Sequence, residues 1–176
     1  MAWRQVLRSL REGTAAAPGP SEDAVRQLAR TLEETARTRL GRGLALFHVD
    51  AGDCGGCALE LRATRGVMLD LRRYGLDFTA TPRQADVLLV SGPLARNARE
   101  SVILTWQAMP DPKWLVGIGD CAVDGGVFKG SYAVDGGIGA VLKPDLLIPG
   151  CPPGPGQIMA GLRTLLAASA MPASRR

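Results

Sequence analysis

Short apolar runs alternate with longer amphipathic segments through most of the chain. The apolar runs are LALFHVD (44–50), ADVLLVSG (85–92), KWLVGIGD (113–120) and DLLIPG (145–150). Residues 58–75, 95–109 and 157–170 have a helical pattern instead, and one face of the first segment would carry Leu59, Ala63, Val67 and Leu71. Continuous apolar strands that alternate with helices are typical of a parallel sheet covered on both faces. The pattern therefore predicts a domain of the α/β class.

The N-terminal part of the chain departs from this pattern. Glycines and prolines in the stretch GTAAAPGPS, residues 13–21, interrupt regular structure and separate an N-terminal arm from the remainder of the chain. Ser21 is suited to cap a helix that continues to about Leu40. We therefore divide the chain into an N-terminal arm and helix, residues 1–43, and an α/β domain, residues 44–176.

Composition and charge exclude several classes of protein. At 176 residues and 46% hydrophobic composition, the chain can bury one sizeable core. No window approaches the roughly 18 to 20 uninterrupted apolar residues that span a bilayer, and the first residues lack the apolar block of a signal peptide. We therefore expect a cytoplasmic chain, free or peripheral on a membrane. The net charge of +4 is mild and the few aromatic residues are not interleaved with a basic stripe, so nucleic acid is not an expected partner.

The four cysteines follow the predicted strands. Cys54 and Cys57 come after the first apolar run, Cys121 after the third and Cys151 after the fourth. Because loops beyond the carboxyl ends of parallel strands share one edge of the sheet, four thiols that are distant in sequence should converge there. A reducing compartment makes structural disulfides a poor explanation for them.

Three kinds of site are compatible with this spacing. Structural zinc also uses four thiolates, but its usual signature is two close pairs rather than one pair and two single cysteines. A redox dithiol explains Cys54 and Cys57, which stand between a strand and a helix, but leaves Cys121 and Cys151 without a role. A 4Fe-4S cluster uses all four. The glycines between the first two cysteines would let the backbone fold tightly and leave amide N–H groups free to hydrogen-bond sulfur.

Four segments carry a resemblance to a known family. They are VDAGDCGGCALEL (49–61), TPRQADVLLVSGP (81–93), MPDPKWLVGIGDCAVDGG (109–126) and LLIPGCPPGP (146–155). In this order they resemble the small subunit of membrane-associated, energy-converting nickel-iron hydrogenases, which is similar to the 20 kDa subunit of respiratory complex I. The two glycines between Cys54 and Cys57 match the hydrogenase branch, since complex I subunits have adjacent cysteines at this point.

The resemblance implies a fold, a cofactor and a set of partners. The fold would be a flavodoxin-like parallel sheet with flanking helices, preceded by the N-terminal arm and helix. One proximal 4Fe-4S cluster would be held by Cys54, Cys57, Cys121 and Cys151. It would relay electrons between a nickel-iron large subunit and ferredoxin-like iron-sulfur subunits, in a complex with membrane subunits on the cytoplasmic face of the inner membrane. The alternatives are a complex I-like quinone or ferredoxin oxidoreductase and a non-catalytic assembly or regulatory subunit.

Individual residues refine this interpretation. Glu60 matches a family glutamate near the catalytic interface and is a candidate for a proton path, with a solvated helix carboxylate or a helix cap as the alternative. The chain departs from the family pattern at Gly55, Ala58, Gly154 and Gly156. His48 is the sole histidine, and its position in an apolar strand favours a packed side chain over a metal ligand.

Overall fold

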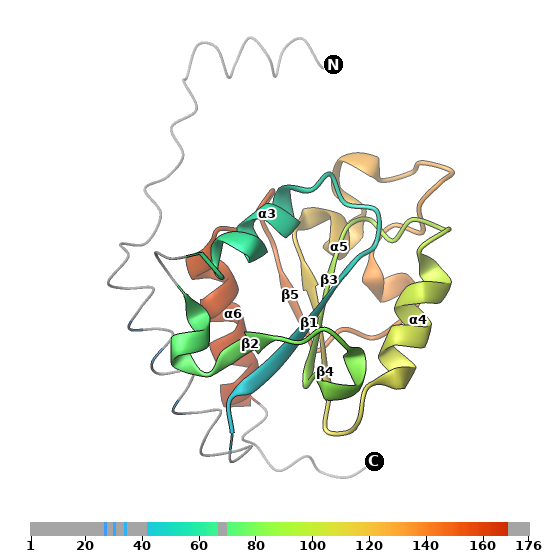
Figure 1. Ribbon diagram of the computed structural model, residues 1–176. Coiled ribbons are helices and arrows are strands. Elements are labelled where there is room, and N and C mark those ends of the chain that lie inside the picture. Colours follow the sequence, from blue (N-terminus) through green and yellow to red (C-terminus); the bar gives the residue numbers. More distant parts are fainter. Residues whose placement is uncertain (1–26, 28–29, 31–33, 35–41, 67–69, 169–176) are drawn as a thin grey trace, which may run out of the picture.

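A five-stranded parallel sheet forms the centre of the protein (Figure 1). The structure is a computed structural model and describes residues 27, 30, 34, 42–66 and 70–168. The strands are β1 (Leu44–Asp50), β2 (Leu76–Phe78), β3 (Val87–Ser91), β4 (Trp114–Ile118) and β5 (Leu146–Ile148), and they lie side by side in the order β2-β1-β3-β4-β5. This order is that of flavodoxin-like folds, so the predicted α/β class and sheet type are confirmed.

Helices cover both faces of this sheet. The helices are α3 (Gly56–Ala63), α4 (Arg99–Ala108), α5 (Asp120–Asp124) and α6 (Pro155–Ala168), and short 3-10 turns lie at 71–74, 82–84, 126–128 and 138–140. One core cluster joins the sheet to α3 and α6, while the other joins its opposite face to α4. In Figure 1, α3 and α6 accordingly lie on one side of the strands and α4 on the other.

The central strand explains why the apolar runs have no polar alternation. Val87 and Leu89 of β3 belong to the core on the α3 and α6 face, whereas Leu88 and Val90 belong to the core on the α4 face. Side chains alternate across a strand, so a strand covered on both faces must be apolar at every position. All four side chains are fully buried.

The segment 58–75 differs from the long helix that its pattern predicts. Helix α3 ends at Ala63, where the Thr64 hydroxyl donates to the Leu61 carbonyl and the backbone turns. Leu59 is 64% exposed, while Leu61 and Leu71 are buried in the core, so the predicted apolar face is wrong. Val67 lies outside the described residues.

Strand β2 was not predicted from the sequence. It has three residues, directly after the turn at Gly75, and among the described strands it pairs with β1 alone, in the register Leu44 with Leu76. A strand this short at a sheet edge carries too few positions for a period to be recognised.

The start of β1 is tied to β3 by a buried carboxylate. Asp86, 4% exposed, accepts two hydrogen bonds from the Arg42 guanidinium, at 2.6 and 2.8 Å, and one from the Ala45 backbone N–H at 2.9 Å. These contacts hold the first residues of the α/β domain. The N-terminal arm lies outside the described residues, and the described positions 27, 30 and 34 are helical. The boundary at residue 43 remains a prediction.

Candidate functional site

Three loops at the carboxyl edge of the sheet carry the cysteines. Cys54 precedes α3 and Cys57 lies in the first turn of this helix, after β1. Cys121 is the second residue of α5, which follows β4, and Cys151 follows β5. All four cysteines are free thiols.

Close contacts show that these loops meet. A Cβ atom added to Gly119, after β4, would lie only 2.6 Å from the Cys57 Sγ atom. A Cβ added to Gly56 would lie 3.6 Å from the Cys54 Sγ and 3.7 Å from a ring atom of Pro152. The loops after β4 and β5 are joined directly as well, because the Asp120 backbone N–H donates to the Gly150 carbonyl and the Gly150 N–H donates to the Asp120 carboxylate. The structure therefore brings the four predicted thiols to one end of the sheet.

The loop before α3 is shaped by two aspartates. Asp50 accepts hydrogen bonds from the backbone N–H groups of Gly52 and Asp53, and Asp53 accepts one from Gly55. The expectation that the Gly55 N–H is free to bond to sulfur is therefore wrong. Gly55 instead supplies a left-handed backbone, φ 86°, at the N-cap of α3.

A backbone N–H group acts on another sulfur of the site. The Val127 backbone N–H lowers the pKa of the Cys121 thiol. A Cβ added to Gly126 would lie 3.1 Å from this sulfur, so the glycine allows the 126–128 turn to approach the cysteine closely. The turn places a fixed dipole against one of the four thiols.

The thiols raise one another's pKa values. Burial raises the pKa of Cys57 from 9.0 to about 12, and the charges of Asp53 and the other three cysteines add to this effect. Burial also raises the pKa of Cys121, together with the charges of Cys151 and Cys54, while the Val127 N–H opposes the rise. Because each thiolate disfavours the others, the ionised set requires a cationic group among them.

Each of the three sequence interpretations can be compared with this geometry. A reactive dithiol requires a lowered thiol pKa, and the pKa of Cys57 is raised instead. Among the described residues, no group of three or more His, Cys, Asp or Glu side chains is arranged to hold a single metal ion. A cluster of four irons binds each thiolate at a different iron, so it needs four thiols that surround a common space without meeting at one point. Four free thiols on three loops that meet are a donor set of the kind that such a cluster binds.

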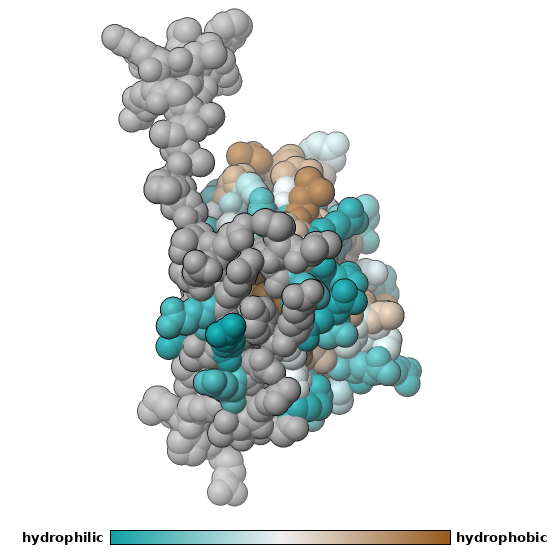
Figure 2. All heavy atoms as spheres, turned by 60° about the vertical axis from the view of Figure 1, so that its left-hand side comes forward, coloured by the Kyte–Doolittle hydropathy of each residue, from teal (hydrophilic) through white to brown (hydrophobic). Residues whose placement is uncertain are grey.

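The site lies at the protein surface. Cys57 and Cys121 are each only 8% exposed, but Cys54 and Cys151 are exposed to solvent. Exposed apolar side chains stand beside them on the chain, among them Leu59 of α3 and Val127, which is 81% exposed. Figure 2 shows hydrophobic residues gathered at the top of the described part, the end at which Figure 1 places α3 and α5. This apolar surface beside the cysteines is the candidate contact surface for another protein.

Glu60 lies on α3, one turn after Cys57, and is half-buried. Within the described part of the chain, its carboxylate has no hydrogen bond or ion pair, and no side chain caps α3. The helix-cap interpretation is therefore not supported. Of the positions that depart from the family pattern, Ala58 lines a cavity beside α3, and the Gly154 N–H donates to Gln157 at the start of α6.

Sequence reasoning missed the residues that shape the site around the sulfurs. Gly119 lies against the Cys57 sulfur from a loop distant in sequence, and Gly126 lies against the Cys121 sulfur from the turn that follows α5. The only available signal was the glycine-rich composition of residues 117–137. Composition alone does not show which glycine lies against which sulfur.

Comparison with known proteins relates the chain to subunits of oxidoreductase complexes. Residues 54–165 match the family described as NADH ubiquinone oxidoreductase, 20 kDa subunit. Formate hydrogenlyase subunit 7 of Escherichia coli is 37% identical over 128 residues, which are 73% of this chain and 50% of that protein. The chain thus spans about half the length of this relative.

Two further relatives are covered more fully. The probable membrane-bound hydrogenase subunit mbhJ of Pyrococcus furiosus is 37% identical over 123 residues, 70% of this chain and 74% of that protein. A subunit of the NADH-quinone oxidoreductase of Geobacter sp. strain M21 is 42% identical over 109 residues, 62% of this chain and 64% of that protein.

A solved structure has the same fold. A chain in the membrane-bound sulfane sulfur reductase, an archaeal respiratory membrane complex, superposes with a TM-score of 0.65 and 27% identity. The match covers 78% of this chain and 74% of that chain.

Proposed function

The chain belongs to the family of the 20 kDa subunit of NADH ubiquinone oxidoreductase, and on this basis we propose that it is an electron-transfer subunit with one 4Fe-4S cluster. Cys54, Cys57, Cys121 and Cys151 hold the cluster, which when bound accepts and releases single electrons. The observation that carries the proposal is the convergence of four free thiols from three loops at one end of the sheet.

The residues around the thiols fix the positions of the sulfur atoms and stabilise their negative charge. The Val127 N–H stabilises negative charge on the Cys121 sulfur, and Gly119 lets the Cys57 sulfur lie directly against the backbone after β4. Burial of Cys57 and Cys121 places one side of the site in a medium of low dielectric constant, and exposure of Cys54 and Cys151 leaves the other side open to a partner.

A large subunit of the nickel-iron hydrogenase type is the partner that we propose for this open side. The CxxC spacing of Cys54 and Cys57 is that of the hydrogenase branch, and two of the relatives are named as a formate hydrogenlyase and a hydrogenase subunit. Ferredoxin-like iron-sulfur subunits and membrane subunits complete the complex. No helix among the described residues is long and apolar enough to cross a membrane. We place the chain peripherally, on the cytoplasmic face of the inner membrane.

A complex I-like quinone or ferredoxin oxidoreductase is the second candidate. It is favoured by the 42% identity to a subunit of a NADH-quinone oxidoreductase. In either complex Glu60 has the position for a proton path, because it is half-buried one helical turn from Cys57.

Metal analysis of the anaerobically purified chain tests the cofactor. We expect about four irons and four sulfides per chain, and a paramagnetic signal after reduction with dithionite. Cys121→Ser and Cys151→Ser should abolish iron binding as fully as Cys54→Ser does. Stoichiometric zinc without iron, or loss of iron in the Cys54 variant alone, would contradict the proposal.

Association with the large subunit tests the partner. Val127→Glu places a charge on the exposed surface beside Cys121 and should reduce co-purification with the large subunit while the iron content stays the same. Leu104→Glu is the matched control, because Leu104 is also exposed, at 56%, but lies on α4. Equal effects of the two substitutions would show that the surface beside the cysteines is not the interface.

A further inference from the structure

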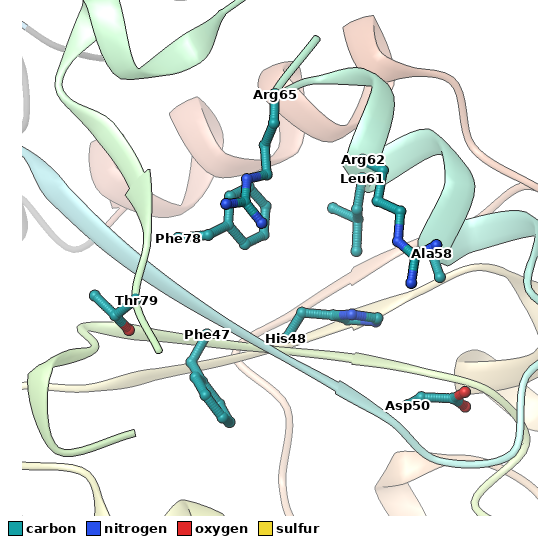
Figure 3. A pocket seen from close by; sticks show the side chains of 9 residues that line it. All are labelled: Phe47, His48, Asp50, Ala58, Leu61, Arg62, Arg65, Phe78 and Thr79. Atoms are coloured by element: carbon teal, nitrogen blue, oxygen red, sulfur yellow. The ribbon is translucent and has the colours of Figure 1, made fainter. Parts of the chain in front are cut away.

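A polar cavity of about 340 Å³ lies beside the cysteine site, between α3 and the strands β1 and β2 (Figure 3). Its lining residues are Phe47, His48, Asp50, Ala58, Leu61, Arg62, Arg65, Phe78 and Thr79. In Figure 3, His48 extends from β1 on the α3 side of the sheet, and the Arg62 guanidinium extends from α3 toward the same layer. Neither the four-thiol site nor the proposed partner surface accounts for this cavity.

A hydrogen-bonded chain leads from the cavity to the loop that carries the first cysteine. The His48 Nε2 atom lies 2.8 Å from the Ser91 hydroxyl oxygen, and the Ser91 hydroxyl donates to the Asp53 carboxylate. Ser91 is fully buried at the carboxyl end of β3. Asp53 also accepts a hydrogen bond from the Gly55 N–H, so this series of hydrogen bonds ends within the turn that contains Cys54.

The direction of the hydrogen bonds between His48, Ser91 and Asp53 determines the tautomer of His48. A serine hydroxyl has one proton, and Ser91 donates it to Asp53. In the contact with Ser91, the His48 Nε2 atom must therefore carry a proton and donate it to the hydroxyl oxygen. Nδ1 is then the unprotonated ring nitrogen, to which a further proton can bind. Within the described part of the chain, no protein hydrogen bond occupies Nδ1.

Charged groups of both signs face His48. Burial lowers its pKa most strongly, Asp53 and Asp50 raise it, and Arg62 lowers it. Arg65 of the same helix also lines the cavity, and β2 contributes only the uncharged Phe78 and Thr79. His48 is therefore neutral near pH 7, but added negative charge at the end of the hydrogen-bonded chain would favour its protonation.

We propose that His48 binds a proton from the cavity when the chain takes up an electron, and releases it when the electron leaves. This inference rests on the proposed function. One electron arrives from a one-electron donor, such as a reduced iron-sulfur subunit, and one proton moves from cavity water to Nδ1 of His48. No other bond forms or breaks, so the net charge of the site is unchanged by reduction.

The reduction potential of the iron-loaded chain tests this coupling as a function of pH. Protonation on reduction raises the potential at lower pH, so each tenfold rise in proton concentration should raise it by about 59 mV for one electron. This slope should appear between the His48 pKa values of the oxidised and reduced protein and vanish outside them. A potential of the unmodified protein that is flat from pH 5 to 9 would overturn the proposal without any variant.

His48→Gln identifies the group responsible. Glutamine keeps an N–H donor for Ser91 but does not titrate, so the iron content should be retained and the slope lost. Arg65→Gln is the control, since it changes a charge on the cavity wall outside the hydrogen-bonded chain and should keep the slope. An unchanged slope in a fully loaded His48→Gln protein would refute the assignment.

A direct measurement remains decisive if His48→Gln does not hold iron. His48 is the only histidine, so selectively labelled protein gives a single histidine signal by nuclear magnetic resonance. Its pKa should be higher in dithionite-reduced than in oxidised protein, and equal pKa values would overturn the proposal. Absence of iron in the unmodified chain would instead refute the proposed function.

Discussion

Gly119→Ala tests the position of the Cys57 sulfur. Gly119 has φ 87° and ψ 158°, a backbone region that is essentially restricted to glycine. An alanine there costs on the order of 1–3 kcal/mol of folding free energy in backbone strain alone. The added Cβ would also lie 2.6 Å from the Cys57 Sγ.

The displacement needed to relieve this contact is large for a metal ligand. Ordinary contacts lie at about 3.5–4.0 Å, so the sulfur and the new methyl group must separate by about 1 Å. Ligand distances in metal sites hold to within about 0.2 Å. We therefore expect the substitution to weaken metal binding by at least the 10–100-fold that is typical for changes beside a ligand.

Iron and sulfide content, the spectrum of the reduced protein and chemical denaturation together provide the assay. Gly130→Ala is the control, because Gly130 also has a positive φ, 80°, but an added Cβ there meets nothing within 4 Å. The control should lose about 1–2 kcal/mol of stability and keep its iron. Full iron content with an unaltered spectrum in Gly119→Ala would refute the placement of the Cys57 sulfur against this glycine.

Three further predictions concern the proton path, the core and the thiols. Glu60→Gln should leave the iron content and the stability unchanged but slow proton-coupled turnover of the assembled complex by about tenfold or more, and normal turnover with full iron would exclude the proton-path role. Asp86→Ala removes the acceptor of the buried Ala45 N–H and should lower the free energy of unfolding by about 2–3 kcal/mol. Asp77→Ala is the control, because Asp77 is exposed. Equal losses of stability in chemical denaturation of the two variants would contradict a stabilising role for the Asp86 carboxylate. Folding raises the pKa of Cys57 from 9.0 to about 12, because the thiolate is disfavoured in the folded protein. The free energy of unfolding of the metal-free protein should therefore be highest below pH 9, where the thiol is protonated in both states. It should decrease as the pH rises from 9 toward 12. Thermal denaturation across this range should show the loss, and a Cys57→Ala protein with the same pH dependence would refute the assignment to this thiol.

Local interactions explain why the segment after Cys57 does not form the long helix that its pattern predicts. The spacing of Leu59, Ala63 and Leu71 fits one helical face, but the chain leaves the helix at Thr64, whose hydroxyl bonds back to the Leu61 carbonyl. Burial of Leu71 is then achieved by a separate turn, and the exposed Leu59 lies near the cysteines instead of in the core. A periodic pattern records which residues are apolar, but the location of the core decides which of them are buried.

The sequence by itself determined the α/β class, four of the five strands and the chain positions of the four cysteines. These features depend on short-range pattern, since a strand that is covered on both faces must be apolar at every position and parallel strands must end at one edge. Only the tertiary structure decided which groups surround each sulfur. Gly119 against Cys57, and Ser91 between His48 and Asp53, join residues from different strands and loops. The packing of the whole sheet sets those contacts, so no local stretch of the sequence specifies them.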